Sequence, residues 1–143
     1  MTYFEDLSPY TYLPETVPPG VTVRNVGWLD GEHPFTVGKP PAQFADKLGV
    51  LCADHATAQT RGIHWCDLCL ESGDDPEESH PVTGTALTLG SAEVRVLTPE
   101  GELLAAPDLV YHYVARHSYL PPEPFIEAVL ADRIAPENDG DQA

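Results

Sequence analysis

Fifteen prolines and eleven glycines in 143 residues limit the length of any helix or strand that this chain can form. Proline has no backbone N–H to donate, so it is disfavoured inside helices and in central strands. The sequence therefore predicts short elements and long connections, although a hydrophobic content of 42% is typical of a folded domain. A sparse core of this kind is a candidate for a bound metal ion that joins distant segments.

A single metal-binding domain is expected over residues 1–132, followed by a disordered acidic tail over residues 133–143. Prolines exclude a regular helix from residues 3–20, where aromatic and leucine side chains indicate an extended arm laid across the core. Residues 72–81 are polar and acidic, which predicts an exposed and mobile loop that includes His80.

The spacing of apolar residues predicts an α+β fold. Alternating β-branched residues favour a strand over residues 21–26. The runs 86–89 and 92–97, followed by a turn over residues 98–101 that leads into residues 102–105, favour a β-hairpin. Helical spacing predicts helices over residues 42–53, over residues 107–117 and from about Pro122. We expect a small antiparallel sheet or hairpin with two to three helices, stapled by a metal site.

The strongest chemical signal is the segment from Gly62 to Cys69, where residues able to bind a metal crowd together. Cys66 and Cys69 are separated by two residues, a spacing at which two thiolates converge on one ion. His64 lies two positions before Cys66, and side chains two apart in a strand share a face. Zinc is the expected cofactor, because mixed thiolate and imidazole ligands suit its tetrahedral preference.

The second half of the site is expected on the helix over residues 107–117. His112 and His117 have four residues between them, within the three to five that are typical of the His pair in structural zinc sites. Positions five apart on a helix differ by about 140°, so the last turn would have to loosen for both imidazoles to converge. His64 could replace one of these histidines as a ligand, so five residues are candidates for the four ligand positions of the ion.

The helical pattern also carries an alternative for these histidines. His117 falls in the middle of the apolar stripe, and His112 falls toward its border. A core imidazole bonded to a carbonyl is therefore the alternative to ligation, for His117 in particular. Cys52 lies on the apolar side of its own helix, where burial as a small hydrophobic residue is favoured over ligation. His33 is expected to be a turn residue.

Motifs that would define a reaction are absent from the sequence. The chain has no His-Glu-x-x-His, no Gly-x-Ser-x-Gly and no Gly-rich phosphate loop. It also lacks the His-x-Glu and Pro-Cys-x-x-Cys pattern of zinc deaminases. A Cys nucleophile paired with His64 or His117 is the poorer hypothesis beside two cysteines at metal spacing. No catalytic residue is assigned.

The charge restricts the partners of this chain. Seven Lys and Arg against 23 Asp and Glu give a formal charge of -16, which repels nucleic acid and anionic lipid. Solubility is the simplest explanation of this acidity, and a basic protein partner is the functional one. The N-terminus lacks a signal pattern, and no segment approaches the roughly 20 apolar residues of a membrane span. With two of three cysteines at metal spacing, we expect a soluble cytoplasmic protein.

Several segments together resemble a family of short uncharacterised bacterial proteins that is frequent in actinomycetes. The resemblance is carried by residues 3–10, 25–29, 61–69 and 111–122, the last including Tyr111, His112, His117, Tyr119 and Pro121. It spans the chain up to about residue 130 and implies that the His-x-Cys-x-x-Cys and Tyr-His-Tyr segments belong together in this family. It implies no activity and no catalytic residue.

Three functions follow from these observations. The first is a structural zinc domain with a role in interaction or regulation, in which the ion joins the Cys66 and Cys69 turn to the helix of His112 and His117. The second is a hydrolase-like metal-dependent enzyme with an open zinc position and Tyr111, Tyr113 or an uncoordinated His as proton donor. The third is an immunity protein that neutralises a basic toxin, which depends only on size and acidity.

Overall fold

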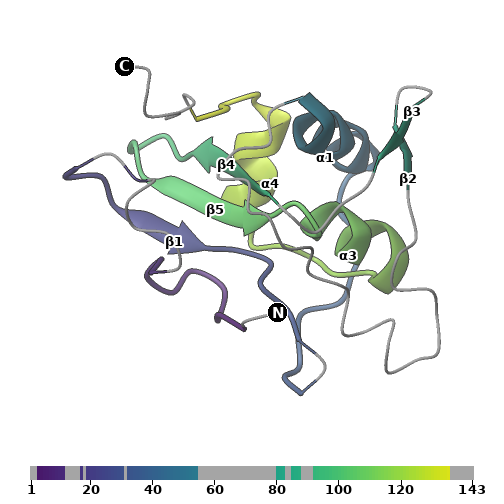
Figure 1. Cartoon of the computed structure of the whole chain (residues 1–143), viewed down its shortest axis with the longest axis horizontal. Coiled ribbons are helices and arrows are strands. Elements are labelled where there is room, and N and C mark those ends of the chain that lie inside the picture. The colour runs from purple at the N-terminus through teal and green to yellow at the C-terminus, as the bar shows by residue number, and fades with distance from the viewer. Residues whose placement is uncertain are drawn as a thin grey trace.

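The computed structural model describes residues 3–11, 17, 19–30, 32–54, 80–82, 85–87 and 92–135, with side chains for all of these except 54, 80–82 and 85–87. Its elements, in chain order, are β1 (Val23–Asn25), α1 (Ala42–Asp54), β2 (His80–Val82), β3 (Thr85–Leu87), β4 (Glu93–Leu97), β5 (Leu103–Pro107), α3 (Val110–His117) and α4 (Glu123–Leu130). The described residues thus contain three helices and two small sheets (Figure 1), which confirms the α+β class.

The larger sheet has the strand order β1-β5-β4. Strands β4 and β5 form the predicted antiparallel hairpin, in which Leu97 pairs with Leu103. Strand β1 instead runs parallel to β5, with Val23 opposite Leu103, so the sheet is mixed and the expectation of an antiparallel sheet is wrong for this pair. A parallel pair needs a long crossover connection, and here most of the chain, including α1, lies between the two strands.

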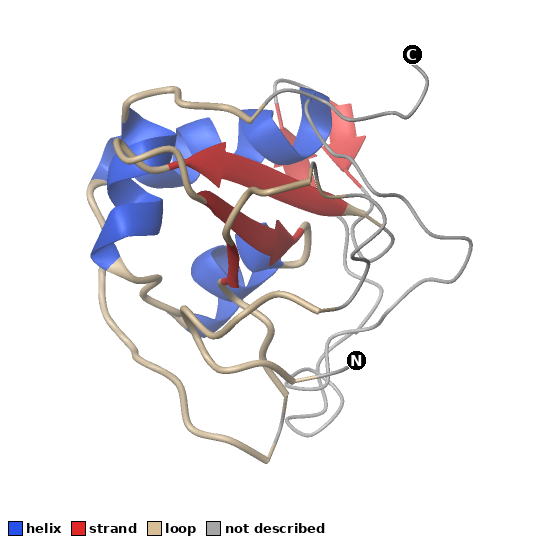
Figure 2. Ribbon diagram, turned by 90° about the vertical axis from the view of Figure 1, so that its left-hand side faces the viewer, coloured by secondary structure: helices blue, strands red, loops and turns tan. Residues whose placement is uncertain are grey.

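Strands β2 and β3 form a separate antiparallel pair in which Val82 lies opposite Thr85. His80 and Pro81 belong to β2, so the expectation that the loop extends through them is wrong. The run at residues 86–89 was expected to join the hairpin, whereas its first two residues pair with β2. The pair of strands lies beside α1 (Figure 2).

Both faces of the larger sheet are covered, by different parts of the chain. Val94, Val96 and Leu104 belong to the hydrophobic cluster formed with the three helices, and α4 lies behind β4 and β5 in Figure 1. Leu103 and Ala105 face the other way, into a second cluster with Tyr10 and Trp28 from the N-terminal part of the chain. Strand β5 is therefore buried along its whole length, because successive side chains point to opposite faces.

The two edges of the sheet are covered as well. Along β1, the arm forms bridges from Phe4 to Trp28 and from Pro9 to Arg24, as the prediction of an extended arm across the core requires. Along β4, Ile134 bridges to Val96, and the backbone N–H of Ala135 donates to the carbonyl of Arg95 at 3.0 Å. Residues 133–135, which the sequence assigned to the tail, thus lie along β4 and bond to its edge.

Gly27 is required where the chain leaves β1 and passes under α3. Its φ is +76°, and a Cβ at this position would lie 2.8 Å from Cγ2 of Val110. We expect Gly27→Ala to lower the free energy of unfolding by about 2 to 4 kcal/mol, since backbone strain adds to a steric clash. Gly20, at φ +80° with open space around it, is the matched control. Gly20→Ala should cost about 1 kcal/mol in urea unfolding, and equal costs at the two positions would contradict the role of the clash.

Candidate metal centre

Helix α3 carries two of the five predicted ligands, His112 and His117. The side chain of His112 is buried, with the residue 2% exposed, whereas His117 is partly exposed. This reverses the sequence-based expectation, in which His117 lay in the middle of the apolar stripe and His112 at its border. Helix α3 contacts α1 and buries Val110, His112, Tyr113 and Val114, so its buried face includes His112 and leaves His117, at the end of the helix, partly exposed.

The two imidazole rings lie side by side although they are five positions apart. Their centroids are 5.1 Å apart, and their planes are inclined by 72°. The helix ends directly after His117, where Ser118 has a left-handed φ of 58° and the backbone N–H groups of Ser118 and Tyr119 both donate to the carbonyl of Tyr113. The bond from Ser118 spans five positions instead of four, so the last turn of the helix is wider than an ordinary α-helical turn.

The separation of the rings can be compared with the geometry of zinc. A zinc ion lies about 2.0 to 2.1 Å from an imidazole nitrogen, which places it roughly 3.2 Å from the ring centroid. Two imidazoles on one tetrahedral ion therefore have centroids about 5 Å apart. The observed 5.1 Å between His112 and His117 agrees with this value. A separation of this size is compatible with shared ligation of one ion, and it is also typical of an edge-to-face contact between two rings.

The remaining predicted ligands, His64, Cys66 and Cys69, lie outside the described residues. Across the described ranges, no group of three or more His, Cys, Asp or Glu is arranged to hold a metal ion. Cys52 is buried, its Sγ lies 3.6 Å from the carbonyl of Asp108, and burial raises the pKa of its thiol. It is therefore a core residue, as predicted. His33 lies in a turn, with its Nδ1 at 2.8 Å from Asp30 and its ring stacked on Tyr3.

Two tyrosines flank the histidines on α3. Tyr113 is buried in the helical core, and its ring contacts that of His112 at a centroid distance of 6.2 Å. Tyr111 is partly exposed, and burial, followed by the nearby charge of Asp46, raises the pKa of its phenol. The phenol of Tyr111 therefore stays protonated at neutral pH. Of the two, only Tyr111 is open to solvent, as a proton donor to a substrate must be.

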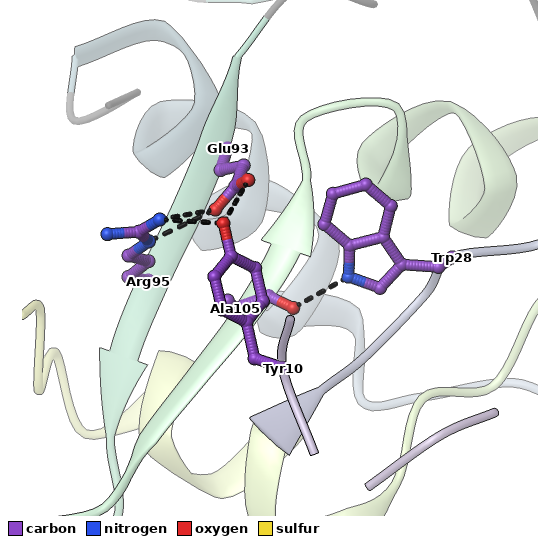
Figure 3. Close-up of polar contacts among 5 residues, drawn as sticks. All are labelled: Tyr10, Trp28, Glu93, Arg95 and Ala105. Atoms are coloured by element: carbon purple, nitrogen blue, oxygen red, sulfur yellow. Dashed lines mark hydrogen bonds and ion pairs between the residues drawn. The ribbon is translucent and has the colours of Figure 1, made fainter. Parts of the chain in front are cut away.

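A buried polar network that the sequence did not predict lies on the opposite face of the sheet (Figure 3). The hydroxyl of Tyr10, in the arm, donates to Oε2 of Glu93 at 2.7 Å. Arg95 donates to Oε1 of Glu93 from Nη2 at 2.8 Å and from Nε at 3.1 Å, and its Nη2 also lies 3.0 Å from the Tyr10 hydroxyl. Each polar group of Glu93 is thus bonded, and the network fixes the arm to β4.

A second missed contact joins the arm to the segment after α3. The hydroxyl of Tyr119 donates to both carboxylate oxygens of Asp6, at 2.9 and 2.8 Å, and the backbone N–H of Gly27 donates to Oδ1 at 2.9 Å. Asp6 thus connects three segments that are distant in sequence. Burial raises the pKa of Asp6, against the smaller lowering by these hydrogen bonds. The contact is structural, because Tyr119 is fully buried.

The raised pKa of Asp6 predicts how stability depends on pH. Between the ordinary pKa of Asp and the raised one, the folded state binds more protons than the unfolded state, so the free energy of unfolding falls as pH rises through this window. Asp6→Asn keeps an acceptor for the Gly27 N–H but does not ionise. We expect the free energy of unfolding of this variant, measured in urea, to fall less than that of the wild type between about pH 4.5 and about pH 7. Parallel curves for the two proteins would contradict this assignment.

Comparison with known proteins gives a family and no activity. The family model described as a domain of unknown function (DUF7919) matches residues 2–130. No curated protein and no solved structure matches the chain. In the described part of the chain, none of the helices has the length and apolar character needed to cross a membrane.

Proposed function

Because the chain belongs to the family described as a domain of unknown function (DUF7919), we propose its function from its own residues: it is a zinc-binding domain with a structural metal site and a role in protein interaction or regulation. The ion is held by Cys66 and Cys69 together with His112 and His117. It joins the Cys-x-x-Cys segment to the end of α3, more than forty positions later in the chain. A reducing compartment such as the cytoplasm keeps the thiolates available for the metal.

One observation carries this proposal: the 5.1 Å separation of the imidazole centroids of His112 and His117. Nothing in an ordinary helix brings side chains five apart together, so the widened end of α3 is what produces the pair. The spacing of Cys66 and Cys69 is that of the thiolate pair in structural zinc sites. The two pairs are thus complementary halves of a Cys₂His₂ donor set.

The number of protein ligands determines what the ion does. Four donors close the tetrahedron, and the ion then stabilises the fold without contacting a substrate. The sheet and helices of this domain are short, and many of its connections contain proline, so a closed site would add stability that packing alone supplies sparingly. His64 is the competing fourth ligand. Loss of one histidine from the set would leave a position for water and favour a metal-dependent hydrolase instead.

The test is metal content and ligand geometry in the native protein. We expect one zinc ion per chain, and, after exchange for cobalt, the intense visible bands of a tetrahedral site together with thiolate-to-metal charge transfer. Single variants Cys66→Ser, Cys69→Ser, His112→Ala and His117→Ala should each weaken metal binding by at least tenfold. Cys52→Ala and His33→Ala are matched controls, because Cys52 is a core residue and His33 is bonded to Asp30.

Each outcome has a defined consequence. A natively folded, metal-free protein would overturn the proposal. Retention of zinc by His117→Ala and its loss from His64→Ala would replace His117 by His64 in the donor set. A five-coordinate or water-bearing cobalt spectrum would contradict a closed structural site and favour the hydrolase.

A further inference from the structure

The surface of α4 carries a groove that the metal site does not use. It has a volume of about 730 Å³ and lies between the loop before α1, the turn before α4 and α4 itself. Its walls are apolar and come from Pro40, Leu120, Pro121, Ile126 and Leu130. Glu123 and Glu127 border it on one side, and Lys39 is the cation among its lining residues. Neither His112 nor His117, the two candidate zinc ligands that the structure describes, lines this groove.

A second hollow, of about 390 Å³, lies on the other side of the same two glutamates. Glu123 and Glu127 line both cavities, because residues four apart on a helix project from one face. Glu100 and Glu102 add to the acidic wall of the hollow, and Arg24 is the cation among the described residues that line it. Arg24 pairs with Glu102 at 3.2 Å, and Arg133 pairs with Glu127. Glu100 and Glu123 line the hollow with no ion pair to either arginine.

Leu7 lines the hollow opposite the glutamates and has two unusual properties. It is 37% exposed, which makes it one of three exposed large hydrophobic side chains among the described residues. Its φ is 68°, a left-handed conformation that costs a bulky residue strain. The backbone N–H of Leu7 donates to the carbonyl of Asn25 at 2.6 Å, which holds this conformation in place. The arm therefore presents an apolar side chain beside an acidic surface at a cost in backbone energy.

We propose that the groove, the hollow and Leu7 form one docking surface for a basic, amphipathic segment of another protein. Apolar side chains of that segment fill the groove of Leu120, Ile126 and Leu130, and its Lys or Arg side chains lie against Glu123 and Glu100. The charge of the chain, -16, attracts such a segment and repels a second copy of this protein. The inference names the surface and the partner class of the interaction role proposed above, and in that respect rests on it.

The test uses synthetic peptides with the full-length, zinc-loaded protein. A peptide of about 12 residues that combines Lys and Leu spans up to about 40 Å when extended, enough to cross both cavities. We expect it to bind with an affinity that falls as salt rises, and we expect no binding of Lys-Ser or Glu-Leu peptides of the same length. Equal binding of the Lys-Ser peptide would contradict the role of the apolar groove. Equal binding of the Glu-Leu peptide would contradict the role of charge complementarity. Self-association of the chain through this face, seen by sedimentation, would also overturn the proposal.

Single substitutions in the surface should change affinity with opposite signs. Glu123→Gln should weaken binding roughly two- to five-fold, and Lys39→Gln should strengthen it by a similar factor, as expected for single exposed charges. Glu32→Gln is the matched control, since it removes an equal charge at an exposed position outside both cavities. An equal loss in Glu32→Gln would show that net charge, and not this surface, attracts the peptide.

Leu7→Gly separates binding from folding. It removes the apolar side chain and relieves the left-handed strain, so the thermal midpoint should stay the same or rise while peptide affinity falls. Unchanged affinity would exclude Leu7 from the surface. Metal content is measured on the wild type and on every variant. A zinc-loaded protein that does not bind the peptide contradicts the docking surface alone, and a zinc-free protein that binds the peptide contradicts the zinc site alone.

Discussion

Replacing Cys66 and Cys69 together by Ser is expected to lower the free energy of unfolding by about 5 kcal/mol or more. The reason is that apparent zinc-binding energies in small domains reach about 10 to 16 kcal/mol, whereas whole domains are stable by only about 5 to 15 kcal/mol. In a chain of 143 residues this corresponds to a fall of at least about 15 °C in the thermal midpoint. Calorimetry with and without a chelator measures it, and zinc should restore the midpoint of the depleted wild type but not of the variant.

The control for this experiment is the third cysteine. Cys52→Ala removes a buried thiol that lies 3.6 Å from the carbonyl of Asp108, and should cost only about 1 to 2 kcal/mol. The chelator should then lower the midpoint of Cys52→Ala as much as that of the wild type. If the metal-depleted wild type unfolds at the same temperature as the loaded protein, zinc does not hold this fold together.

Local patterns predicted the elements whose periodicity can be read from neighbouring residues. Helix α1 and the β4–β5 hairpin follow from such periodicity, because the helix presents one apolar stripe to the core and the hairpin alternates along its strands. The parallel pairing of β1 with β5 depends on partners about eighty positions apart, and no local pattern encodes the direction of such a pair. The prediction for His80 and Pro81 fails for a different reason: they pair with β3 only a few positions later, but the polar and acidic residues before them predict a loop.

The candidate site shows the same limit in its side chains. Spacing identified His112 and His117, but the rotation of α3 and the widened turn at Ser118 decide which ring is buried and whether the rings meet. Glu93 and Arg95 alternate with valines on β4, which is typical of a strand with one face in solvent. The arm covers that face, and Tyr10 bonds to Glu93 from 83 positions away. Such a contact depends on the complete fold.

Hydrogen bonds explain several residues in the segments that carry the family resemblance. Asn25 donates from its side-chain amide to the carbonyl of Pro9 at 2.8 Å, and the indole N–H of Trp28 donates to the carbonyl of Ala105 at 3.0 Å. Gly27 and Tyr119 both bond to Asp6. These residues fix the N-terminal arm to the sheet. A structural role therefore accounts for these residues.

The covered face of the sheet predicts the second large effect. Arg95→Met should lower the free energy of unfolding by about 3 to 5 kcal/mol, because it leaves the carboxylate of Glu93 buried without its cation. The side chains of Glu93 and Arg95 are only 3% and 6% exposed, so solvent cannot replace the lost partner. Arg95 also lies over the Tyr10 ring at 5.3 Å, and the arm should detach from β4 in this variant. Urea unfolding measures the energy, and proteolysis near Tyr10 reports the arm.

A second substitution and a change of pH identify the cause. The double variant Glu93→Gln and Arg95→Met has no charge in the network of Tyr10, Glu93 and Arg95, and Gln still accepts from the Tyr10 hydroxyl. At least about half of the lost free energy of unfolding should therefore return. Burial already raises the pKa of Glu93 in the wild type, and loss of Arg95 should raise it further. The folded Arg95→Met protein then holds a proton that the unfolded chain releases, so its deficit should shrink as pH falls toward the ordinary pKa of Glu and grow as pH rises. A deficit that is independent of pH and persists in the double variant would assign the effect to lost packing of the Arg95 side chain instead of to the buried charge.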